Sequence, residues 1–326
     1  MKAQTIIISR TDSIGDVVLT LPMCGLIKRQ SPETKIIFLG RSYTEPIVMA
    51  SSMVDAFINW DEMKDKSPSQ QVDILKQAGA DAIIHVFPRR EIIWIAKKAA
   101  IPVRIATGGR WYTLTKCNKL VFFSRKRSHL HEAQLNMKLL EPLGIHEIPA
   151  LDVIPELYGF TKVSQLDAGF LSLIDTERKT VVLHPKSRGS AVEWGPENFR
   201  DLVNRLSPAE YQVFVTGTSE EQKWVKERIT WPDGVIDLSG QMSLDQLISF
   251  ISRADILIAA STGPLHIASA LGKKAIGLFS PKRPIHPGRW APLGRNAIVI
   301  CASQHPAEGQ YLDISPDVVL KKIQEN

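Results

Sequence analysis

Two stretches of the sequence place polar side chains among small and apolar residues in patterns that suit acid–base chemistry or ligand binding. The first, residues 9–22, reads SRTDSIGDVVLTLP and carries Asp12 and Asp16 on either side of Gly15. Asp16 falls at the start of an expected helix, where the helix dipole favours a negative charge. Its position alone leaves two interpretations open, a structural carboxylate at a helix start or a general base at the mouth of a cleft.

The second stretch, residues 256–268, reads ILIAASTGPLHIA and predicts a buried strand, a turn of small residues and a helix that begins near Pro264. The N–H groups at a helix start can bind an anion such as a diphosphate, although an ordinary Ser or Thr cap gives the same pattern. His266, within the first turn, suits a packed residue and a ligand contact equally. The residues that leave room for a ligand beside the backbone are Ser261, Thr262 and Gly263.

Three other loops that follow expected strands could touch the same ligand. The loop after residues 181–184 contains two cations, which could neutralise phosphate charge or simply form a solvated basic loop. The other two loops, at residues 216–219 and 238–243, are small and polar. Candidate ligand contacts in the three loops are Lys186, Ser187, Arg188, Thr216, Gly217 and Met242.

Short apolar runs alternate with helical stretches along the chain, which predicts an α/β fold built from parallel βαβ units. Strands are expected at residues 4–9, 35–39, 81–85, 103–106, 181–184, 212–216, 235–238, 256–260 and 274–279. Helices are expected at residues 16–30, 70–79, 89–99, 131–143, 196–206, 220–228, 244–253, 265–271 and 316–324, and a loop at 107–119. Because doubly wound sheets hold ligands at the carboxyl ends of their strands, the candidate loops should line such a crevice.

The length of 326 residues predicts two domains. The strand–helix rhythm fails between about residues 148 and 178, so the boundary is expected near residue 170. Hydrophobic residues make up 44% and charged residues 23%, a balance that excludes disordered and fibrous classes. No apolar run is long enough to span a membrane and the N-terminus does not resemble a signal peptide, so a cytoplasmic location is expected.

The net charge of +6 suits an acidic partner, although no nucleic-acid-binding motif accompanies it and no nucleic acid is expected. The basic cluster at residues 125–127 is interpreted as solvated surface. Cys24, Cys117 and Cys301 are scattered, which predicts reduced thiols. The sequence lacks Asp-x-Asp, His-Glu-x-x-His, Gly-x-Gly-x-x-Gly and Gly-x-Ser-x-Gly, so no metal or cofactor is expected beyond a co-substrate.

The first two stretches together resemble glycosyltransferase family 9, the ADP-heptose:lipopolysaccharide heptosyltransferases. The second half adds a turn at residues 261–268 and the segments 277–281 and 290–292, which are similar to the family's ending. The N-terminal family pattern is matched by Arg10, Asp12, Ile14, Gly15, Asp16, Val18, Leu19, Thr20 and Pro22.

The resemblance implies a GT-B fold, in which two doubly wound Rossmann-like domains face one another across a cleft. Residues 1–170, joined by the C-terminal helix at 316–326, would bind the acceptor, and residues 171–315 would bind the nucleotide sugar. It implies an inverting, metal-independent transfer of heptose from ADP-heptose onto a lipopolysaccharide-core or related acceptor, with Asp16 as the base. An anionic, lipid-linked or oligosaccharide acceptor would suit the basic charge and a peripheral contact with the inner membrane face.

On this interpretation the remaining candidate residues divide between two ligands. The acceptor would be bound by Arg10, Asp12, Ser13 and Gly15. The donor would be bound by Lys186, Ser187, Arg188, Thr216, Gly217, Met242, Ser261, Thr262, Gly263, Pro264 and His266.

Three other functions stay open. A sugar-nucleotide epimerase on the same fold would turn over a nucleotide sugar with no acceptor present. A non-catalytic sugar-nucleotide-binding protein of envelope assembly would bind the donor without turnover that depends on Asp16. A nucleic-acid binder would show strongly salt-dependent affinity for generic DNA.

Overall fold

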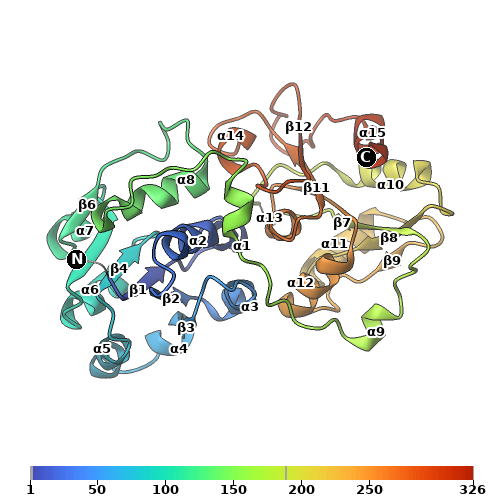
Figure 1. Ribbon diagram of the computed structural model, residues 1–326. Coiled ribbons are helices and arrows are strands. Elements are labelled where there is room, and N and C mark those ends of the chain that lie inside the picture. Colours follow the sequence, from blue (N-terminus) through green and yellow to red (C-terminus); the bar gives the residue numbers. More distant parts are fainter. Residues whose placement is uncertain (1–2, 188, 326) are drawn as a thin grey trace. The chain divides into compact units, whose positions relative to one another are not determined.

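The computed structural model describes residues 3–187 and 189–325, so Arg188, one of the predicted donor contacts, lies outside the described residues. The chain forms two compact units, Met1–Lys162 and Val163–Asn326, which we call unit 1 and unit 2. Each unit is built on a six-stranded sheet covered by helices (Figure 1). The observed pairings within both sheets are parallel, as the sequence predicts for βαβ units.

The strands of unit 1 lie in the order β3-β2-β1-β4-β5-β6. Their bounds are β1 (Thr5–Ser9), β2 (Lys35–Gly40), β3 (Ala56–Asn59), β4 (Ala82–His85), β5 (Val103–Thr107) and β6 (Lys119–Val121). The α-helices are α1 (Ile14–Val18), α2 (Leu21–Gln30), α3 (Glu45–Met49), α4 (Trp60–Lys64), α5 (Pro68–Gln77), α6 (Arg90–Lys98), α7 (Trp111–Lys116) and α8 (Glu132–Met137). Short 3₁₀ helices are η1 (Ser42–Thr44), η2 (Lys138–Leu143) and η3 (Ile154–Leu157).

Three expectations for unit 1 were wrong in detail. The helix expected at residues 16–30 is two helices, because Pro22 cannot continue a helix interior and instead starts α2. The helix expected at residues 131–143 tightens into η2, which contains Pro142. The loop expected at residues 107–119 contains α7 and leads into the edge strand β6.

The core of unit 1 follows from strands that are apolar on both faces. Ile7 of β1 pairs in register with Ile37 of β2 and Ile83 of β4, and all three side chains are buried. Helix α6 covers this layer with Ile92 and Ala96, which are one helical turn apart and fully buried. The packing holds the ends of β1 and β4 in fixed positions.

Unit 2 repeats the same topology. Its strand order is β12-β11-β10-β7-β8-β9, which matches unit 1 when the strands are renumbered within the unit. The strands are β7 (Lys179–His184), β8 (Tyr211–Val215), β9 (Ile236–Asp237), β10 (Ile256–Ala260), β11 (Lys274–Phe279) and β12 (Ala297–Cys301). The helices are α9 (Ala168–Leu171), α10 (Pro196–Arg205), α11 (Ser219–Arg228), α12 (Leu244–Arg253), α13 (Gly263–Ala270), α14 (Pro287–Trp290) and α15 (Pro316–Gln324). Among the helices of residues 3–187 and 189–325, none is long and apolar enough to cross a membrane.

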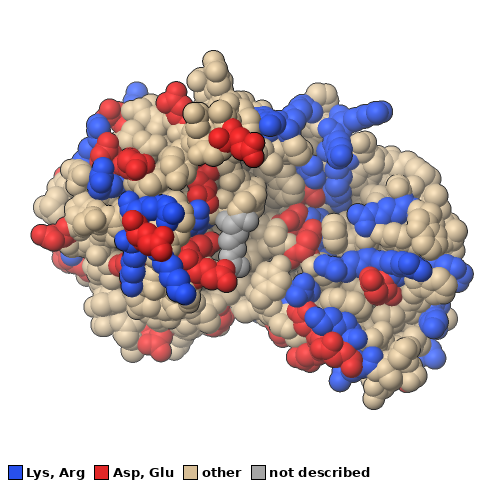
Figure 2. Space-filling view, turned by 180° about the vertical axis from the view of Figure 1, so that it is seen from behind, with Lys and Arg blue, Asp and Glu red and all other residues tan. Residues whose placement is uncertain are grey.

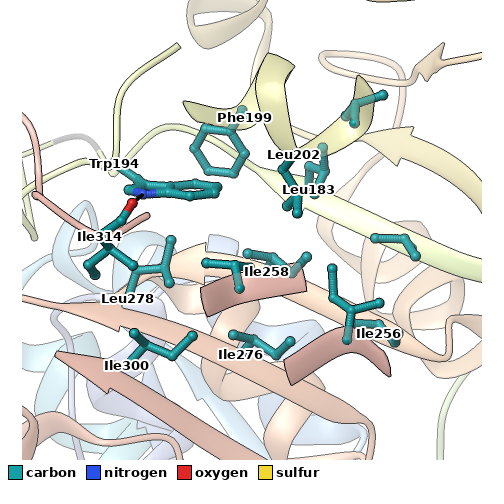
Figure 3. Packing of buried hydrophobic residues seen from close by; sticks show 14 of the residues in the cluster. Leu183, Trp194, Phe199, Leu202, Ile256, Ile258, Ile276, Leu278, Ile300 and Ile314 are labelled. Atoms are coloured by element: carbon teal, nitrogen blue, oxygen red, sulfur yellow. Dashed lines mark hydrogen bonds between the residues drawn. The ribbon is translucent and has the colours of Figure 1, made fainter. Parts of the chain in front are cut away.

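The core of unit 2 is centred on Trp194, a fully buried side chain. Its ring lies edge-on to Phe199, with 4.9 Å between centroids, and its Nε1 donates to the carbonyl oxygen of Ile314 at 2.7 Å. Figure 3 shows this pair above the isoleucine and leucine side chains of the sheet. The indole thus ties the segment before α15 to the segment before α10.

This core corrects the expected place of the C-terminal helix. Val319 and Ile323, four residues apart on α15, are buried in the cluster around Trp194. Helix α15 also packs against α10. Its apolar face is therefore used within unit 2, and residues 316–324 belong to that compact unit.

The boundary between the units lies eight residues before the expected one. Residues 154–162 pack on unit 1, where η3 lies against α2 so closely that a Cβ on Gly25 would come 2.1 Å from a carbonyl oxygen of η3. The N–H of Lys162 still donates to Ala50 at 2.9 Å. Ser164 already contacts unit 2, through its hydroxyl to Asp245 at 2.9 Å.

His85, at the end of β4, is a buried and titratable group inside unit 1. The side chain is fully buried, and neither ring nitrogen has a hydrogen-bond partner within the described part of the chain. Burial, with a smaller contribution from the charge of Arg104, lowers the pKa of His85 to about 3. The imidazole is therefore neutral in the folded protein at all but strongly acidic pH.

We predict that His85 makes unit 1 acid-sensitive. The unfolded side chain takes up a proton below about pH 6.5, whereas the folded one does not, so stability falls as the pH drops from about 6.5 towards 3. Between pH 7 and pH 5 the loss attributable to this group is about 2 kcal/mol. Urea unfolding of His85→Leu should show a correspondingly smaller loss over this interval, whereas His146→Leu, at an exposed site, should keep the full loss. Equal losses for wild type and His85→Leu would contradict the prediction.

Candidate functional site

The strand order gives the candidate loops a shared location within each unit. The order reverses between β1 and β4 in unit 1, and between β7 and β10 in unit 2. Such a switch point leaves a crevice at the carboxyl ends of the two strands, where open α/β sheets bind ligands. Residues 10–16 follow β1, residues 185–187 follow β7, and residues 261–263 follow β10. Both stretches singled out by sequence therefore lie at a switch point.

Arg10, directly after β1, is a buried guanidinium surrounded by acceptors. Only 3% of its surface is exposed. Its Nε lies 2.6 Å from Oδ1 of Asp12, and its Nη2 donates to Oδ1 of Asp16. Its Nη1 lies 3.5 Å from Oε1 of Glu132, which is 122 residues away in sequence. Three carboxylates thus converge on one buried cation.

The charges of this cluster act on one another. Burial lowers the pKa of Arg10, but the charges of Asp12, Asp16 and Glu132 outweigh burial and raise it above its usual range. Burial raises the pKa of the Asp12 carboxyl above its ordinary value, although Arg10 opposes that change. Arg10 is consequently a permanent cation, and Asp12 is more readily protonated than an exposed aspartate.

Asp16 lies in the first turn of α1 and is held from two sides. Its Oδ1 accepts from Arg10 and its Oδ2 accepts from the hydroxyl of Ser13. The side chain keeps 17% of its surface exposed. Its main-chain carbonyl accepts from Oγ1 of Thr20 at 2.8 Å. The carboxylate is therefore fixed in direction and still accessible, the arrangement that general-base chemistry requires.

Helix α8 supplies two further partners of Arg10, Glu132 and Asn136. Glu132 begins α8, its side chain is 1% exposed, and its Oε1 also accepts from Nη1 of Arg125. The same Arg125 nitrogen donates to Oδ1 of Asn136 at 3.0 Å. Nδ2 of Asn136 in turn donates to the carbonyl oxygen of Leu19 at 3.1 Å and to Oγ1 of Thr20 at 3.2 Å. The chain just after α1 and helix α8 are thereby joined through polar groups.

The other predicted acceptor residues lie beside this cluster. Ser13 is exposed and caps the start of α1 by position, without a side-chain bond to the helix backbone. Gly15 lies within α1, and its carbonyl oxygen accepts from the N–H of Leu19 at 3.0 Å. The exposed Tyr43, which sequence reasoning did not select, donates its hydroxyl to the carbonyl oxygen of Asp12.

In unit 2, the loop after β7 is organised by Glu193. Oε1 of this carboxylate accepts from the N–H of Ser187 at 3.0 Å and from its hydroxyl at 3.1 Å. Oε2 lies 2.6 Å from Nζ of Lys186, which also sits 3.9 Å from the ring centroid of Trp224. Lys186 is therefore paired in this structure, and a phosphate would have to share it with Glu193.

The loop after β8 lies between the end of β7 and the loop after β9, as the strand order requires. Oγ1 of Thr216 is 3.1 Å from Nδ1 of His184. The N–H of Gly240 donates to the carbonyl oxygen of Gly217 at 2.8 Å, and a Cβ on Gly217 would come 3.3 Å from Oγ of Ser239. Met242, two residues beyond Gly240, is half-buried.

The turn before α13 combines an open helix start with an unused hydroxyl. Thr262 occupies the N-cap position in an extended conformation, yet its side chain makes no capping bond. Its Oγ1 is buried and has no hydrogen-bond partner within residues 3–187 and 189–325. Pro264 and His266 both lie in the first turn of α13, and His266 is buried. The carbonyl oxygen of Ser261 accepts from Oγ of Ser190 at 3.3 Å, which joins this turn to the loop after β7.

The turn thus has the features of an anion site at a helix start. The first N–H groups of a helix have no partner within the helix, and the dipole favours negative charge there. A buried hydroxyl without a partner carries a desolvation cost that a ligand can remove. Gly263, the first residue of α13, adds no side chain that would keep a ligand away from the backbone.

Comparison with known proteins fits this arrangement of two switch points. A model of glycosyltransferase family 9 (heptosyltransferase) matches residues 75–314. The chain belongs to glycosyltransferase family 9. It is therefore a glycosyltransferase, and the two sheets are those of the GT-B fold.

Several members of family 9 are similar to this chain over nearly its whole length. The lipopolysaccharide core heptosyltransferase OpsX of Haemophilus influenzae is 23% identical over 324 residues, with 94% of this chain and 87% of that protein covered. A family 9 glycosyl transferase from Veillonella parvula superposes with a TM-score of 0.77 at 17% identity, covering 98% and 96% of the two chains. The Escherichia coli heptosyltransferase WaaC with ADP superposes with a TM-score of 0.73 at 18% identity, covering 98% and 99%.

The sequence analysis did not identify the residues that hold the predicted site residues of this family 9 chain in place. Arg125 was assigned to solvated surface, whereas it points inward to Glu132 and Asn136. Glu193 was not selected, although it holds both Lys186 and Ser187. Single-sequence patterns could not reveal these pairings, because the partners of Arg125 depend on how α8 packs.

We predict that Glu132 is required for the stability of the Arg10 cluster. Glu132→Gln removes the charge that faces two guanidinium groups in a buried place and should lower the free energy of unfolding by about 3 kcal/mol or more. Glu141→Gln removes a half-exposed carboxylate that lies 3.4 Å from Lys138, so it should change stability by less than about 0.5 kcal/mol. Urea unfolding of both variants is the measurement. A Glu132→Gln protein as stable as wild type would show that Glu132 does not hold Arg10.

Proposed function

We propose that this family 9 glycosyltransferase transfers heptose from ADP-heptose onto an acceptor of the lipopolysaccharide core, with inversion at the anomeric carbon. Family membership supports this choice of donor and acceptor, as does the similarity to a lipopolysaccharide core heptosyltransferase and to a heptosyltransferase with ADP-2-deoxy-2-fluoro heptose. Unit 1 would take the acceptor and unit 2 the nucleotide sugar. The observation that carries the proposal is the Asp16 carboxylate, which is fixed by Arg10 and partly exposed at the switch point of unit 1.

In the proposed reaction, Asp16 acts as the general base. An acceptor hydroxyl attacks the anomeric carbon, and a new carbon–oxygen bond forms as the bond from that carbon to the diphosphate oxygen breaks. The hydroxyl proton passes to Asp16, and ADP leaves with the bonding electron pair. Arg10 keeps the carboxylate directed, while the hydroxyl of Ser13 occupies the side that an acceptor hydroxyl would take over.

The leaving diphosphate gains negative charge, and the turn before α13 is suited to receive it. The N–H groups at the helix start and the hydroxyl of Thr262 supply donors that need no rearrangement. Lys186 would contribute if the diphosphate competes with Glu193 for its ammonium group. We therefore propose that charge on the leaving group is stabilised by the protein without a metal. Four other contacts with the donor stay predictions: Thr216, Gly217, Met242 and His266.

We predict that Asp16→Asn strongly slows transfer while leaving donor binding intact. The amide has nearly the same shape but accepts no proton, so the rate should fall about 10²- to 10⁴-fold. Product formation from ADP-heptose and a lipopolysaccharide-core acceptor measures the rate, and the thermal midpoint with ADP measures donor binding.

The control for that variant is Asp73→Asn, which removes an exposed carboxylate on α5 and should retain full transfer. Transfer by Asp16→Asn at the wild-type rate would reject Asp16 as the base. Donor consumption by the wild type without any acceptor would favour an epimerase instead.

We predict that Thr262→Val weakens binding of ADP and ADP-heptose by about tenfold or more, because a hydrogen bond to a charged group contributes about 1.5 to 3 kcal/mol. The free protein should not lose stability, since the hydroxyl has no partner within the described residues. Titration of the thermal midpoint with ADP, UDP and GDP sugars, repeated in EDTA, is the measurement. Unchanged ADP affinity in Thr262→Val would move the donor site away from α13, and a response only to UDP or GDP sugars would reject heptose as the donor sugar.

A further inference from the structure

The positive charge of the chain is concentrated in one segment of unit 1. Residues 89–127 contain eleven Lys and Arg residues and a single acidic residue, Glu91. This segment carries a formal charge of +10, whereas the whole chain carries +6, so the rest of the chain is net negative. The basic character of the protein is therefore a property of α6, α7, β6 and the loop that follows.

Many of these charges reach the surface. Arg110, Lys119, Lys126 and Arg127 are exposed. Figure 2 shows Lys and Arg side chains prevailing over the top and outer edge of the lobe on the right of that view, which is unit 1. An area of this kind attracts anionic surfaces over roughly a Debye length.

Exposed apolar side chains occur in the same segment. Eleven large hydrophobic residues are exposed in the described part of the chain, and four of them fall between residues 94 and 122. The four are Trp94, Trp111, Leu114 and Phe122, with exposures of 36%, 58%, 52% and 73%. Exposed apolar groups that gather in this way, next to one sign of charge, mark an interaction surface.

Basic side chains of this segment contact two of its exposed aromatic rings. Trp111 and Leu114 lie three residues apart on α7, so they share a face of the helix. The guanidinium of Arg90 lies 5.3 Å from the ring centroid of Trp111, and Nζ of Lys116 lies 4.2 Å from that of Trp94. Helices α6 and α7 also pack against each other, so their exposed side chains form one continuous face.

Phe122 extends this face to the carboxyl edge of the sheet. It follows β6, and its ring lies against Gly108, where a Cβ would come within 2.2 Å of the ring. The ring is supported from one side by the backbone and open to solvent on the other. Lys126 and Arg127 follow in the same loop.

This loop is also joined to the Arg10 cluster. Arg125 stands between Phe122 and Lys126 in the loop, but its side chain turns inward to Glu132 and Asn136. It also donates to the carbonyl oxygen of Val86, just after β4, at 3.3 Å. The outward-facing residues of the loop are therefore held at a set position on the edge of the sheet that carries Asp16.

We propose that this face, formed by Trp94, Trp111, Leu114, Phe122, Lys126 and Arg127, docks unit 1 on an anionic phospholipid bilayer. Trp and Phe insert favourably at the boundary between headgroups and acyl chains, and Lys and Arg are attracted to anionic headgroups. The biological purpose rests on the proposed function: a lipid-linked acceptor lies in a membrane, and docking brings its sugar to the edge of the sheet that holds Asp16. Vesicle binding itself requires neither donor nor acceptor.

The test is co-sedimentation of the full chain with vesicles of phosphatidylcholine alone and of phosphatidylcholine with phosphatidylglycerol, at two salt concentrations. We expect binding only to the anionic vesicles, and weaker binding at high salt. Lys126→Glu/Arg127→Glu should reduce binding at least about 25-fold, because each basic residue near the surface contributes about fivefold. Trp111→Ser/Phe122→Ser should reduce it about tenfold or more through lost apolar burial.

Matched control variants lie in unit 2. Lys223→Glu/Lys226→Glu reverses two exposed charges on α11, and Leu171→Ser/Leu173→Ser removes two exposed leucines, so both should bind vesicles as the wild type does. Thermal midpoints of all four variants check that each folds. An equal loss of vesicle binding in the control and test variants would overturn the proposal, because the loss would then follow from net charge or stability and not from this face.

Three further outcomes test this inference, and the first two separate it from the proposed function. If the test variants still transfer heptose to a water-soluble acceptor fragment but fail with acceptor embedded in vesicles, both stand. If the wild type does not bind anionic vesicles and yet transfers heptose, the docking face is wrong and the proposed function is unaffected. If single-stranded DNA binds to the face more tightly than vesicles do and displaces them, the face is a nucleic-acid site and the proposal fails.

Discussion

The buried charge of Arg10 is the constraint on which the candidate active site depends. A guanidinium out of water costs several kcal/mol unless anions and other acceptors surround it. Asp12 and Asp16 come from the adjoining turn, but Glu132 and Asn136 come from α8, more than a hundred residues later. Satisfying one charge thus joins the end of β1, the start of α1 and the start of α8. The direction of the Asp16 carboxylate is one consequence of that arrangement.

The sequence was sufficient to predict the strands that form the middle of each sheet. Runs within residues 4–9 and 256–260 are continuously apolar, which is typical of a parallel strand buried on both faces. The edge strands β3, β6 and β12 were missed. They are short or partly exposed, as with the three residues of β6 and with Val299 of β12, which is 40% exposed. The edge of each sheet that carries the candidate ligand loops was nonetheless predictable, because these loops follow the central strands.

What the sequence could not provide was the pairing of charged side chains. Lys186 was expected to face phosphate, and the structure adds Glu193 and Trp224 as its present partners. Helix α15 was expected on the other domain from family resemblance, whereas Val319 and Ile323 complete the core around Trp194. In each case the periodicity correctly placed the element or loop. The partner was decided by packing between segments far apart in the chain, which no local pattern records.

The cluster at residues 125–127 shows why neighbouring charges need separate explanations. The side chain of Arg125 points inward because the carboxylate of Glu132 is buried. Without Arg125, that carboxylate would have Arg10 as its only cationic partner in the described part of the chain. Lys126 and Arg127, with no such demand on them, stay exposed and add to the charge of the outer face. Because Arg125 anchors this loop to Glu132, Asn136 and Val86, the next two residues, Lys126 and Arg127, are held in place at the edge of the sheet. The electrostatics that fix Asp16 therefore also fix the loop through which unit 1 would meet an anionic surface.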